Sequence, residues 1–295
     1  MRAGIMNRRG LLKLMAGLSL ATPLLNGFTA APQSTSLKAT PKGVKSIFYD
    51  SNLCIGCRLC QRACREKWGL KTELAAFYPS SSPRLSSNTW VTIIAKPSSS
   101  GGFLFARRSC QHCDEPACAS VCPARAITKH ENGPVVIDEK RCFGCQYCIV
   151  ACPFRVPKLD PELKVARKCS MCHDLVAKGQ PPACVQVCPT KALKFGDKEE
   201  IAALAMERAK KTGGYLYGLR EAAGTNVLLL LKAPSLELGL PEVSTSSYTS
   251  PAVLGEVLTV RGGLGLFGLA VLAFLGFVLW RREVIGREKV KEIPR

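Results

Sequence analysis

The sequence has few of the side chains that enzymes use for acid–base or hydrolytic chemistry. Only three histidines occur among 295 residues, namely His112, His130 and His173, and the chain has no nucleotide-binding loop and no metal-hydrolase motif. Without catalytic groups in a recognisable pattern, the sequence offers no constellation for a reaction of its own. The chain is therefore expected to be non-catalytic.

Cysteine is missing from both ends of the chain. All sixteen cysteines lie between Cys54 and Cys188. The length allows one or two domains, and a hydrophobic content of 47% is not that of a disordered protein. The clustering marks one cysteine-dependent module with less specialised segments on either side.

The cysteines fall into four groups of four, with none left over. In the first and third groups, three cysteines stand at three-residue intervals and a fourth follows four residues later, as in CIGCRLCQRAC. Three cysteines at this spacing wrap a loop around one face of a cubane, so that their sulfurs reach three iron corners. The groups are Cys54, Cys57, Cys60, Cys64; Cys110, Cys113, Cys118, Cys122; Cys142, Cys145, Cys148, Cys152; and Cys169, Cys172, Cys184, Cys188.

Three other uses of these cysteines are weaker. Zinc favours pairs of cysteines that fold back on each other, which the first and third groups fit poorly. Disulfides between so many cysteines three residues apart would be strained. The run KCSMCHDL contains Cys169, Cys172 and His173 in the pattern of c-type haem attachment, but a haem would leave Cys184 and Cys188 beside an incomplete cluster. We therefore expect His173 to be a bystander.

Two pairs of segments repeat along the chain. The stretch before the third group, VVIDEKRCFGC, resembles IFYDSNLCIGC before the first, and VCPARAI after the second group resembles VCPTKAL after the fourth. A two-cluster ferredoxin has this order of cysteine group, C-P-x-x-A, hairpin, I-D-x-x-x-C and cysteine group. The second and third groups reproduce the order directly, and the first and fourth reproduce it only if the chain is read around a circle. The sequence thus predicts an α+β fold in which one bacterial-ferredoxin-like dicluster unit is inserted into another.

The repeats also predict how the cysteines are shared. In two-cluster ferredoxins the fourth cysteine of a group ligates the other cluster. The alternative pairs the first group with the second and the third with the fourth, which ignores the repeats. Crossed ligation predicts the sets Cys54, Cys57, Cys60 with Cys188; Cys169, Cys172, Cys184 with Cys64; Cys110, Cys113, Cys118 with Cys152; and Cys142, Cys145, Cys148 with Cys122.

Acidic residues are scarce, since 22 Asp and Glu stand against 41 Lys and Arg, for a net charge of +19. Such a balance ordinarily suggests nucleic acid, because basic patches gain by neutralising phosphates. Four cubanes held by thiolates would each carry about −2 when oxidised, which brings the loaded chain to about +11. Part of the remaining charge lies in the two terminal segments, so no nucleic-acid partner is expected.

The N-terminus resembles an export signal. In MNRRGLLKLMAGLSLATPLLNGF, Arg8 and Arg9 precede a mildly apolar run, which predicts a twin-arginine signal over residues 1–31 and a linker over 32–45. An ordinary secretory signal or a membrane anchor is the alternative, and cleavage stays open. The twin-arginine route exports folded, cofactor-loaded proteins, so an exported cysteine-rich chain need not contain disulfides.

Near the C-terminus, the run GGLGLFGLAVLAFLGFVLW at 262–280 is apolar and free of charge. Its 19 residues just span a hydrocarbon core, and a buried soluble helix is the alternative. The basic tail 281–295 is then cytoplasmic by the positive-inside rule. The sequence thus predicts a single-pass membrane protein with its cluster domain on the extracytoplasmic, periplasmic side.

The segments around the cysteine groups complete the predicted domain plan. A strand is expected at Trp90–Ala95 within a surface insertion, a helix after Asp197 and Glu200 in capping-box positions, and a buried strand at 226–231. The outer ferredoxin-like unit is predicted at 46–109 and 153–198 with an insertion at 70–109, the inserted unit at 110–152, and a C-terminal extension at 199–255.

From about Asp50 to Pro241 the chain resembles the four-cluster iron-sulfur beta subunit of respiratory formate dehydrogenase. It is similar, nearly as much, to the corresponding subunit of membrane-bound nickel-iron hydrogenase, within the dimethyl sulfoxide reductase superfamily. The run KCSMCHDLVAKGQPPACVQVCPTKALKFG at 168–196, the following GTNVLLLL and the single tail helix carry the resemblance.

The resemblance implies four [4Fe-4S] clusters that relay electrons between two partners. These are a catalytic alpha subunit, with molybdopterin or nickel-iron, and a membrane cytochrome b subunit that reacts with quinone. An enzyme that used a cluster as a Lewis acid or radical source would need a cluster held by three cysteines, with one iron open to substrate. Sixteen cysteines supply a ligand to every iron of four clusters. Formate dehydrogenase beta subunits commonly lack a signal of their own and the hydrogenase subunit carries a twin-arginine leader, so the electron donor stays open.

Overall fold

The computed structural model describes residues 43–71, 84–99, 101–249 and 271–281. Its main sheet consists of β1 (Lys45–Asp50), β8 (Leu193–Asp197), β9 (Tyr215–Tyr217) and β10 (Val227–Leu231). The strand order is β8-β1-β10-β9. β1 runs antiparallel to β8 and parallel to β10, and β9 runs antiparallel to β10. The sheet therefore joins segments that lie far apart in the sequence.

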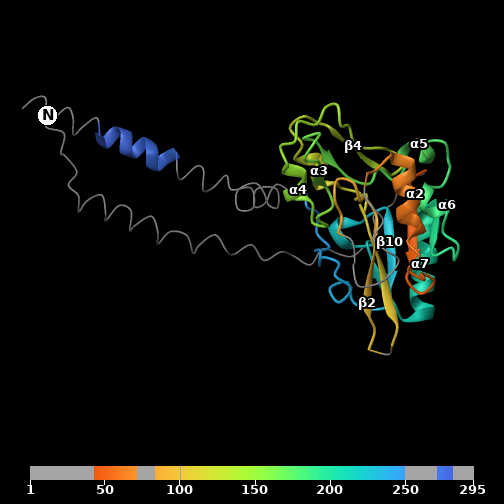
Figure 1. Ribbon diagram of the computed structural model, residues 1–295. Coiled ribbons are helices and arrows are strands. Elements are labelled where there is room, and N and C mark those ends of the chain that lie inside the picture. The colour runs from red at the N-terminus through yellow and green to blue at the C-terminus, as the bar shows by residue number, and fades with distance from the viewer. Residues whose placement is uncertain (1–42, 72–83, 100, 250–270, 282–295) are drawn as a thin grey trace, which may run out of the picture. The chain divides into compact units, whose positions relative to one another are not determined.

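Helix α7 (Lys198–Thr212) covers one face of this sheet and lies beside β10 in Figure 1. Alternate residues of a strand point to opposite faces. Phe48 and Leu228 pack against Ile201 of α7, whereas Tyr49 and Leu229 belong to the apolar cluster on the other face, which also contains several of the cysteines. The central position of β10 explains why all five of its residues are buried.

A strand pair flanked by two short cysteine-bearing helices occurs twice. In one copy, β4 (Ile127–Lys129) pairs antiparallel with β5 (Val135–Ile137). In the other, β8 follows the fourth cysteine group and pairs antiparallel with β1, which precedes the first. The helices α3 (Ala117–Ser120) and α4 (Tyr147–Ala151) lie side by side, as do α2 (Leu59–Trp68) and α6 (Ala183–Gln186) (Figure 1). The α+β ferredoxin-like arrangement is thus built once from consecutive segments and once from distant ones.

The segment between the first two cysteine groups packs into the core. A strand forms there as predicted, at β2 (Thr92–Pro97), and pairs antiparallel with β3 (Phe103–Arg108), which the sequence did not predict. Trp90 and Ile93 are buried in the same apolar cluster as Tyr49. The prediction of a plain surface insertion is therefore wrong for this hairpin, because one of its faces covers the cysteine loops.

The predicted helix and strand of the C-terminal extension are both present. α7 begins after Asp197 and ends at Gly213, whose left-handed backbone (φ 64°) closes it. Asp197 occupies the N-cap position, but its carboxylate makes no capping hydrogen bond and accepts one from Lys45 at 2.8 Å. The predicted capping box is therefore wrong, because the Asp197 carboxylate pairs with Lys45 of β1 and makes no hydrogen bond to the first turn of α7. The remaining elements are β6 (Lys158–Leu159), β7 (Ala166–Arg167), α5 (His173–Val176) and the 3₁₀ turn η2 (Glu221–Ala223).

Most of the two predicted terminal segments lies outside the described residues. This holds for the signal 1–31, for residues 32–42, for 262–270 of the predicted membrane helix and for 282–295 of the tail. Residues 271–281 form a helix whose side chains are largely exposed. Among the helices within the described ranges, none combines the length and the apolar composition needed to cross a bilayer.

Asp50 ties α7 to the end of β1. Its side chain is buried at 2% exposure, and Arg208 donates two hydrogen bonds to Oδ2, at 2.9 and 2.7 Å. An amide at this position cannot balance the guanidinium charge. The substitution Asp50→Asn is therefore expected to lower the free energy of unfolding by about 1–3 kcal/mol, measured by anaerobic urea denaturation.

Asp138 provides the matched control, because it stands four residues before a cysteine in the other repeat. It is exposed, and its Oδ1 accepts a hydrogen bond from the backbone N–H of Lys140 at 2.9 Å. Asp138→Asn should change stability by less than about 0.5 kcal/mol. Equal losses in both variants would show that the aspartate matters for its turn rather than for the ion pair with Arg208.

Candidate metal centres

All sixteen cysteines lie in the described part of the chain and are free thiols. None is exposed, and half of them are buried: Cys60, Cys64, Cys110, Cys118, Cys148, Cys169, Cys172 and Cys184. Thiols gathered inside a fold and not joined to one another are typical ligands for soft metals.

The first three cysteines of the first group face a cavity together with the last cysteine of the fourth group. We call this set site A. Its cavity is walled by Cys54, Cys57, Cys60, Cys188, Tyr49 and Ile93. The thiol of Cys54 interacts electrostatically with those of Cys57 and Cys188, so the four sulfurs share one environment.

The remaining cysteine of the first group turns toward the fourth group. The strongest thiol interactions of Cys64 are with Cys169, Cys184 and Cys172, in that order. We call these four residues site B. Site B thus takes three ligand candidates from one loop and a fourth from helix α2.

The inserted unit has the same arrangement. At site C, Cys113 interacts with Cys152, Cys110 and Cys118. At site D, Cys148 interacts with Cys142, Cys145 and Cys122. Each of the four sites thus gathers three thiols from one cysteine group and one from another group.

The four sites form a series. Sites A and B are neighbours through Cys60 and Cys184. Sites B and C meet through Cys169 and Cys110. Sites C and D meet through Cys118 and Cys148. The order A–B–C–D therefore runs from the outer unit into the inserted unit.

Burial favours the protonated form of several of these thiols. It raises the pKa of Cys60 and Cys148 to about 12 and that of Cys152 to about 11. Metal binding needs thiolates, so loading of these sites is coupled to proton release.

Backbone amides point at several of the sulfurs. The N–H groups of His112 and Met171 donate to Cys110 and Cys169, each at 3.4 Å. In the same way Ala126 donates to Cys122 and Ala166 donates to Cys142, each at 3.3 Å. Such bonds stabilise a cluster's thiolates and raise its reduction potential.

The cysteine loops owe these directions to left-handed backbone positions that recur in both units. Arg58 and Gln146 follow Cys57 and Cys145 with φ of 57° and 66°. Gly144 has φ of 75°, and a Cβ there would collide with the backbone carbonyl oxygen of Lys164. Glycine at this position is therefore required both by conformation and by space.

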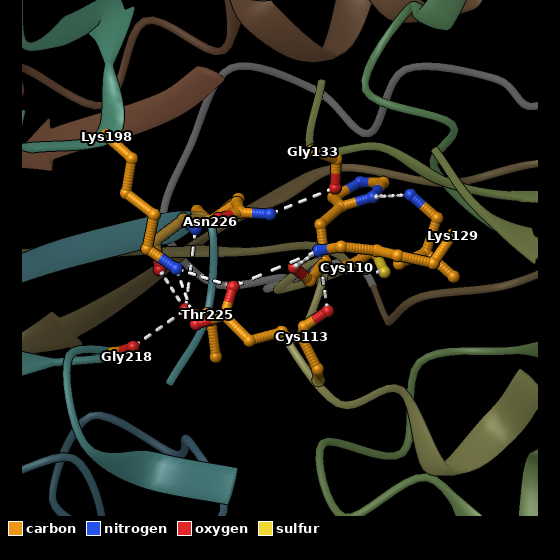
Figure 2. A network of polar contacts seen from close by, with 12 residues as sticks. Cys110, Cys113, Lys129, Gly133, Lys198, Gly218, Thr225 and Asn226 are labelled. Atoms are coloured by element: carbon orange, nitrogen blue, oxygen red, sulfur yellow. Dashed lines mark hydrogen bonds and ion pairs between the residues drawn. The ribbon is translucent and has the colours of Figure 1, made fainter. Parts of the chain in front are cut away.

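The loop of the second cysteine group is fastened to the main sheet (Figure 2). Lys129 donates to the carbonyls of His112 and Cys113, at 3.3 and 2.8 Å. Cys113 also bridges to Thr225, just before β10, and the Asn226 amide donates to Gly133 at 3.0 Å. The C-terminal extension thus holds the inserted unit in place, which the sequence did not predict.

The histidines are not placed as ligands of these sites. His112 is buried, and its Nδ1 accepts a hydrogen bond from the backbone of Val135 at 2.9 Å. His173 stacks between Trp68 and His130, with ring centroids 6.1 and 5.9 Å away. Cys172 lies with Cys64 in site B.

Among the described residues, two cations that are no more than 5% exposed were not predicted from the sequence. Arg107 on β3 is 1% exposed, and Lys168, next to Cys169, is 5% exposed. The only signal in the sequence is a basic residue one to three positions before a cysteine group. That signal is weak, because Arg141 directly precedes Cys142, as Lys168 precedes Cys169, and Arg141 is exposed.

The donor set fits an iron-sulfur cubane. Each site offers one thiol per iron corner, three from a single loop and one from elsewhere, with amides directed at sulfur. Within the described ranges, no three His, Cys, Asp or Glu side chains converge as they would around a single metal ion.

Comparison with known families matches residues 102–198 to the 4Fe-4S dicluster domain. The formate dehydrogenase-O iron-sulfur subunit of Escherichia coli K12 is 35% identical over 85% of this chain and 88% of its own length. The hydrogenase-2 operon protein HybA of E. coli O157:H7 is 31% identical over 94% of this chain and 96% of its own. The thiosulfate reductase electron transfer subunit PhsB of Salmonella typhi is 44% identical over 52% and 78%.

These similarities extend well beyond the cysteine loops, because the formate dehydrogenase and hydrogenase relatives align over most of both chains. The chain belongs to the family of 4Fe-4S dicluster iron-sulfur subunits that includes those of formate dehydrogenases and the hydrogenase-2 operon protein.

Proposed function

We propose that the protein holds four [4Fe-4S] clusters, one at each of sites A to D, and relays electrons along that series. The observation that carries the proposal is the arrangement of sixteen free thiols in four sets, each adjacent to the next. The ligands are Cys54, Cys57, Cys60, Cys188 at site A; Cys64, Cys169, Cys172, Cys184 at site B; Cys110, Cys113, Cys118, Cys152 at site C; and Cys122, Cys142, Cys145, Cys148 at site D.

When bound, each cluster accepts and donates one electron. The chain itself fixes the spacing of the sites, keeps water from them and supplies amides to the sulfurs. Helix α2 carries Cys60 of site A and Cys64 of site B, and α4 carries Cys148 of site D and ends just before Cys152 of site C. The units that bind the clusters therefore also set the distance between neighbours.

The partners are proposed to dock at the two ends of the series. Ile55, next to Cys54, and Phe143, next to Cys142, are 62% and 64% exposed. Exposed apolar side chains beside a terminal site suit an interface with another subunit. One partner would be a catalytic alpha subunit and the other a membrane cytochrome b subunit that reacts with quinone.

The complex is proposed to be of formate dehydrogenase type, with the electron-transfer subunit itself non-catalytic. Several relatives carry the printed name of formate dehydrogenase iron-sulfur subunits, which supports this choice. The alternative is a nickel-iron hydrogenase or another molybdopterin oxidoreductase, which the likeness to HybA and the twin-arginine-like leader favour. The leader and the apolar run 262–280 support export and single-pass anchoring, with the tail in the cytoplasm.

The cluster inventory is tested by iron and acid-labile sulfide on anaerobically purified protein. We expect about sixteen iron atoms per chain and reducible centres at every site in low-temperature electron paramagnetic resonance (EPR). Stoichiometric zinc with little iron, or only enough iron for one or two clusters, would overturn the proposal.

The type of complex is tested by gentle solubilisation of the native membrane and metal analysis of the subunit that copurifies. Molybdenum or tungsten is expected and would favour formate or a related substrate. Nickel would instead select the hydrogenase alternative. Recovery of the chain without any redox partner would contradict a role as a relay.

A further inference from the structure

Arg107 is the most deeply buried charged side chain near the clusters. It extends from β3 at 1% exposure and donates hydrogen bonds to the Ser109 hydroxyl and, at 3.7 Å, to the sulfur of Cys184. Its Nε is buried and has no hydrogen-bond partner in the described part of the chain. A guanidinium in such a place is costly unless negative charge offsets it.

Protein carboxylates do not supply that charge among the described residues. The ion pairs found there join other cations to Asp or Glu and leave Arg107 without one. The groups that interact with the guanidinium are the thiols of Cys184 and Cys169 at site B and of Cys60 at site A. Arg107 therefore faces two neighbouring sites at once.

Cysteine ligates iron as the thiolate, so sites A and B, once loaded, supply the negative charge that Arg107 needs. A cubane with four thiolates carries about −2 when oxidised and about −3 after it takes up one electron.

We infer that Arg107 is a fixed positive charge shared by the clusters of sites A and B, which favours their reduced forms and so raises both reduction potentials. The inference rests on the proposed function, because it needs a cluster at each site. Arg107 acts on the clusters through its positive charge and does not ligate iron. The more negative reduced cluster gains more from the guanidinium, and burial leaves the interaction little screened.

The test is a redox titration of the holoprotein, with dithionite as the source of electrons and EPR as the readout. Arg107→Met should lower the reduction equilibrium constants of clusters A and B at least tenfold, which is 59 mV for a one-electron couple, and change those of C and D by less than twofold. Arg107→Lys keeps the charge and should restore most of the shift.

Arg62 offers a matched control, since it lies between Cys60 and Cys64 on α2. It is exposed and paired with Glu66 at 2.7 Å, so water and salt screen its charge. Arg62→Met should leave all four potentials unchanged. If its effect on A and B equalled that of Arg107→Met, burial of the charge would not be the cause.

A second pair of variants separates charge from shape. Arg107→Gln keeps polar hydrogen bonding and loses the charge, so it should behave like Met rather than like Lys. Equal potentials in the Lys and Gln variants would overturn the inference. So would loss of iron from sites A and B in all variants, because the residue would then serve only to hold the fold. Wild-type protein with about sixteen irons upholds the proposed function whichever of these results is found.

Discussion

Replacing Cys64 with alanine is expected to remove the cluster at site B, whereas Cys60→Ala removes the cluster at site A. The two cysteines lie one turn apart in α2, and a cluster built from the four cysteines of one group would place both at one centre. In the structure Cys64 interacts with Cys169, Cys172 and Cys184. Cys60 and Cys188 line one cavity. Alanine supplies no ligand, so a four-iron centre loses one corner.

The measurement is iron content together with EPR of the reduced protein. Each variant should fall from about sixteen to about twelve irons per chain. The signal that Cys64→Ala loses should be the one that Cys172→Ala loses, and Cys60→Ala should match Cys188→Ala. Arg62→Met, between the two cysteines, controls for disturbance of the helix and should keep its full iron.

Loss of the same signal in Cys60→Ala and Cys64→Ala would contradict crossed ligation. So would retention of the site A cluster in Cys188→Ala together with loss of the cluster held by Cys169. Either result would favour clusters that are each built from the four cysteines of one group, and the ligand sets proposed for all four sites would need to be redrawn.

The proposed grouping of the cysteines could be reached from the sequence because the information is local. Three of the cysteines proposed for each site lie on one loop, and the repeated segments around Asp50 and Asp138 indicate which loops correspond. The pairing of β1 with β8 agrees with the outer unit read around a circle, although neither strand was predicted from the sequence. The strand at Val227–Leu231 was visible as an apolar run because it is buried on both faces.

What the sequence did not show depends on contacts between distant segments. β3 carries two arginines and an exposed Phe103, so its pattern does not indicate a buried strand. Arg107 comes close to Cys60 and Cys184 only because β3 lies over the loops that hold them. Asp197 has the sequence of a helix cap, but Lys45 reaches it only through the pairing of β1 with β8.

Removing the iron is expected to unfold the inserted unit while the main sheet stays folded. The apolar core of the inserted unit is small, and Cys118 and Cys148 are two of its five buried members, with Cys122 and Cys142 packed against them. The cluster between α7 and the sheet contains no cysteine among its buried members and includes Phe48, Ile201, Ala205, Leu228 and Leu230. Metal binding therefore contributes far more of the folding free energy to the first core than to the second.

Amide hydrogen exchange by mass spectrometry, before and after anaerobic chelation, measures this difference. Peptides from 110–152 should lose at least about a hundredfold of their protection, whereas α7 and β10 should change little, because local opening costs range from about zero to the global value. Equal loss in both regions would mean that the two units unfold as one. Protection of 110–152 that survives without iron would mean that hydrogen bonds from Lys129 and Asn226 hold the inserted unit by themselves. The inserted unit would then fold without its clusters, contrary to the prediction.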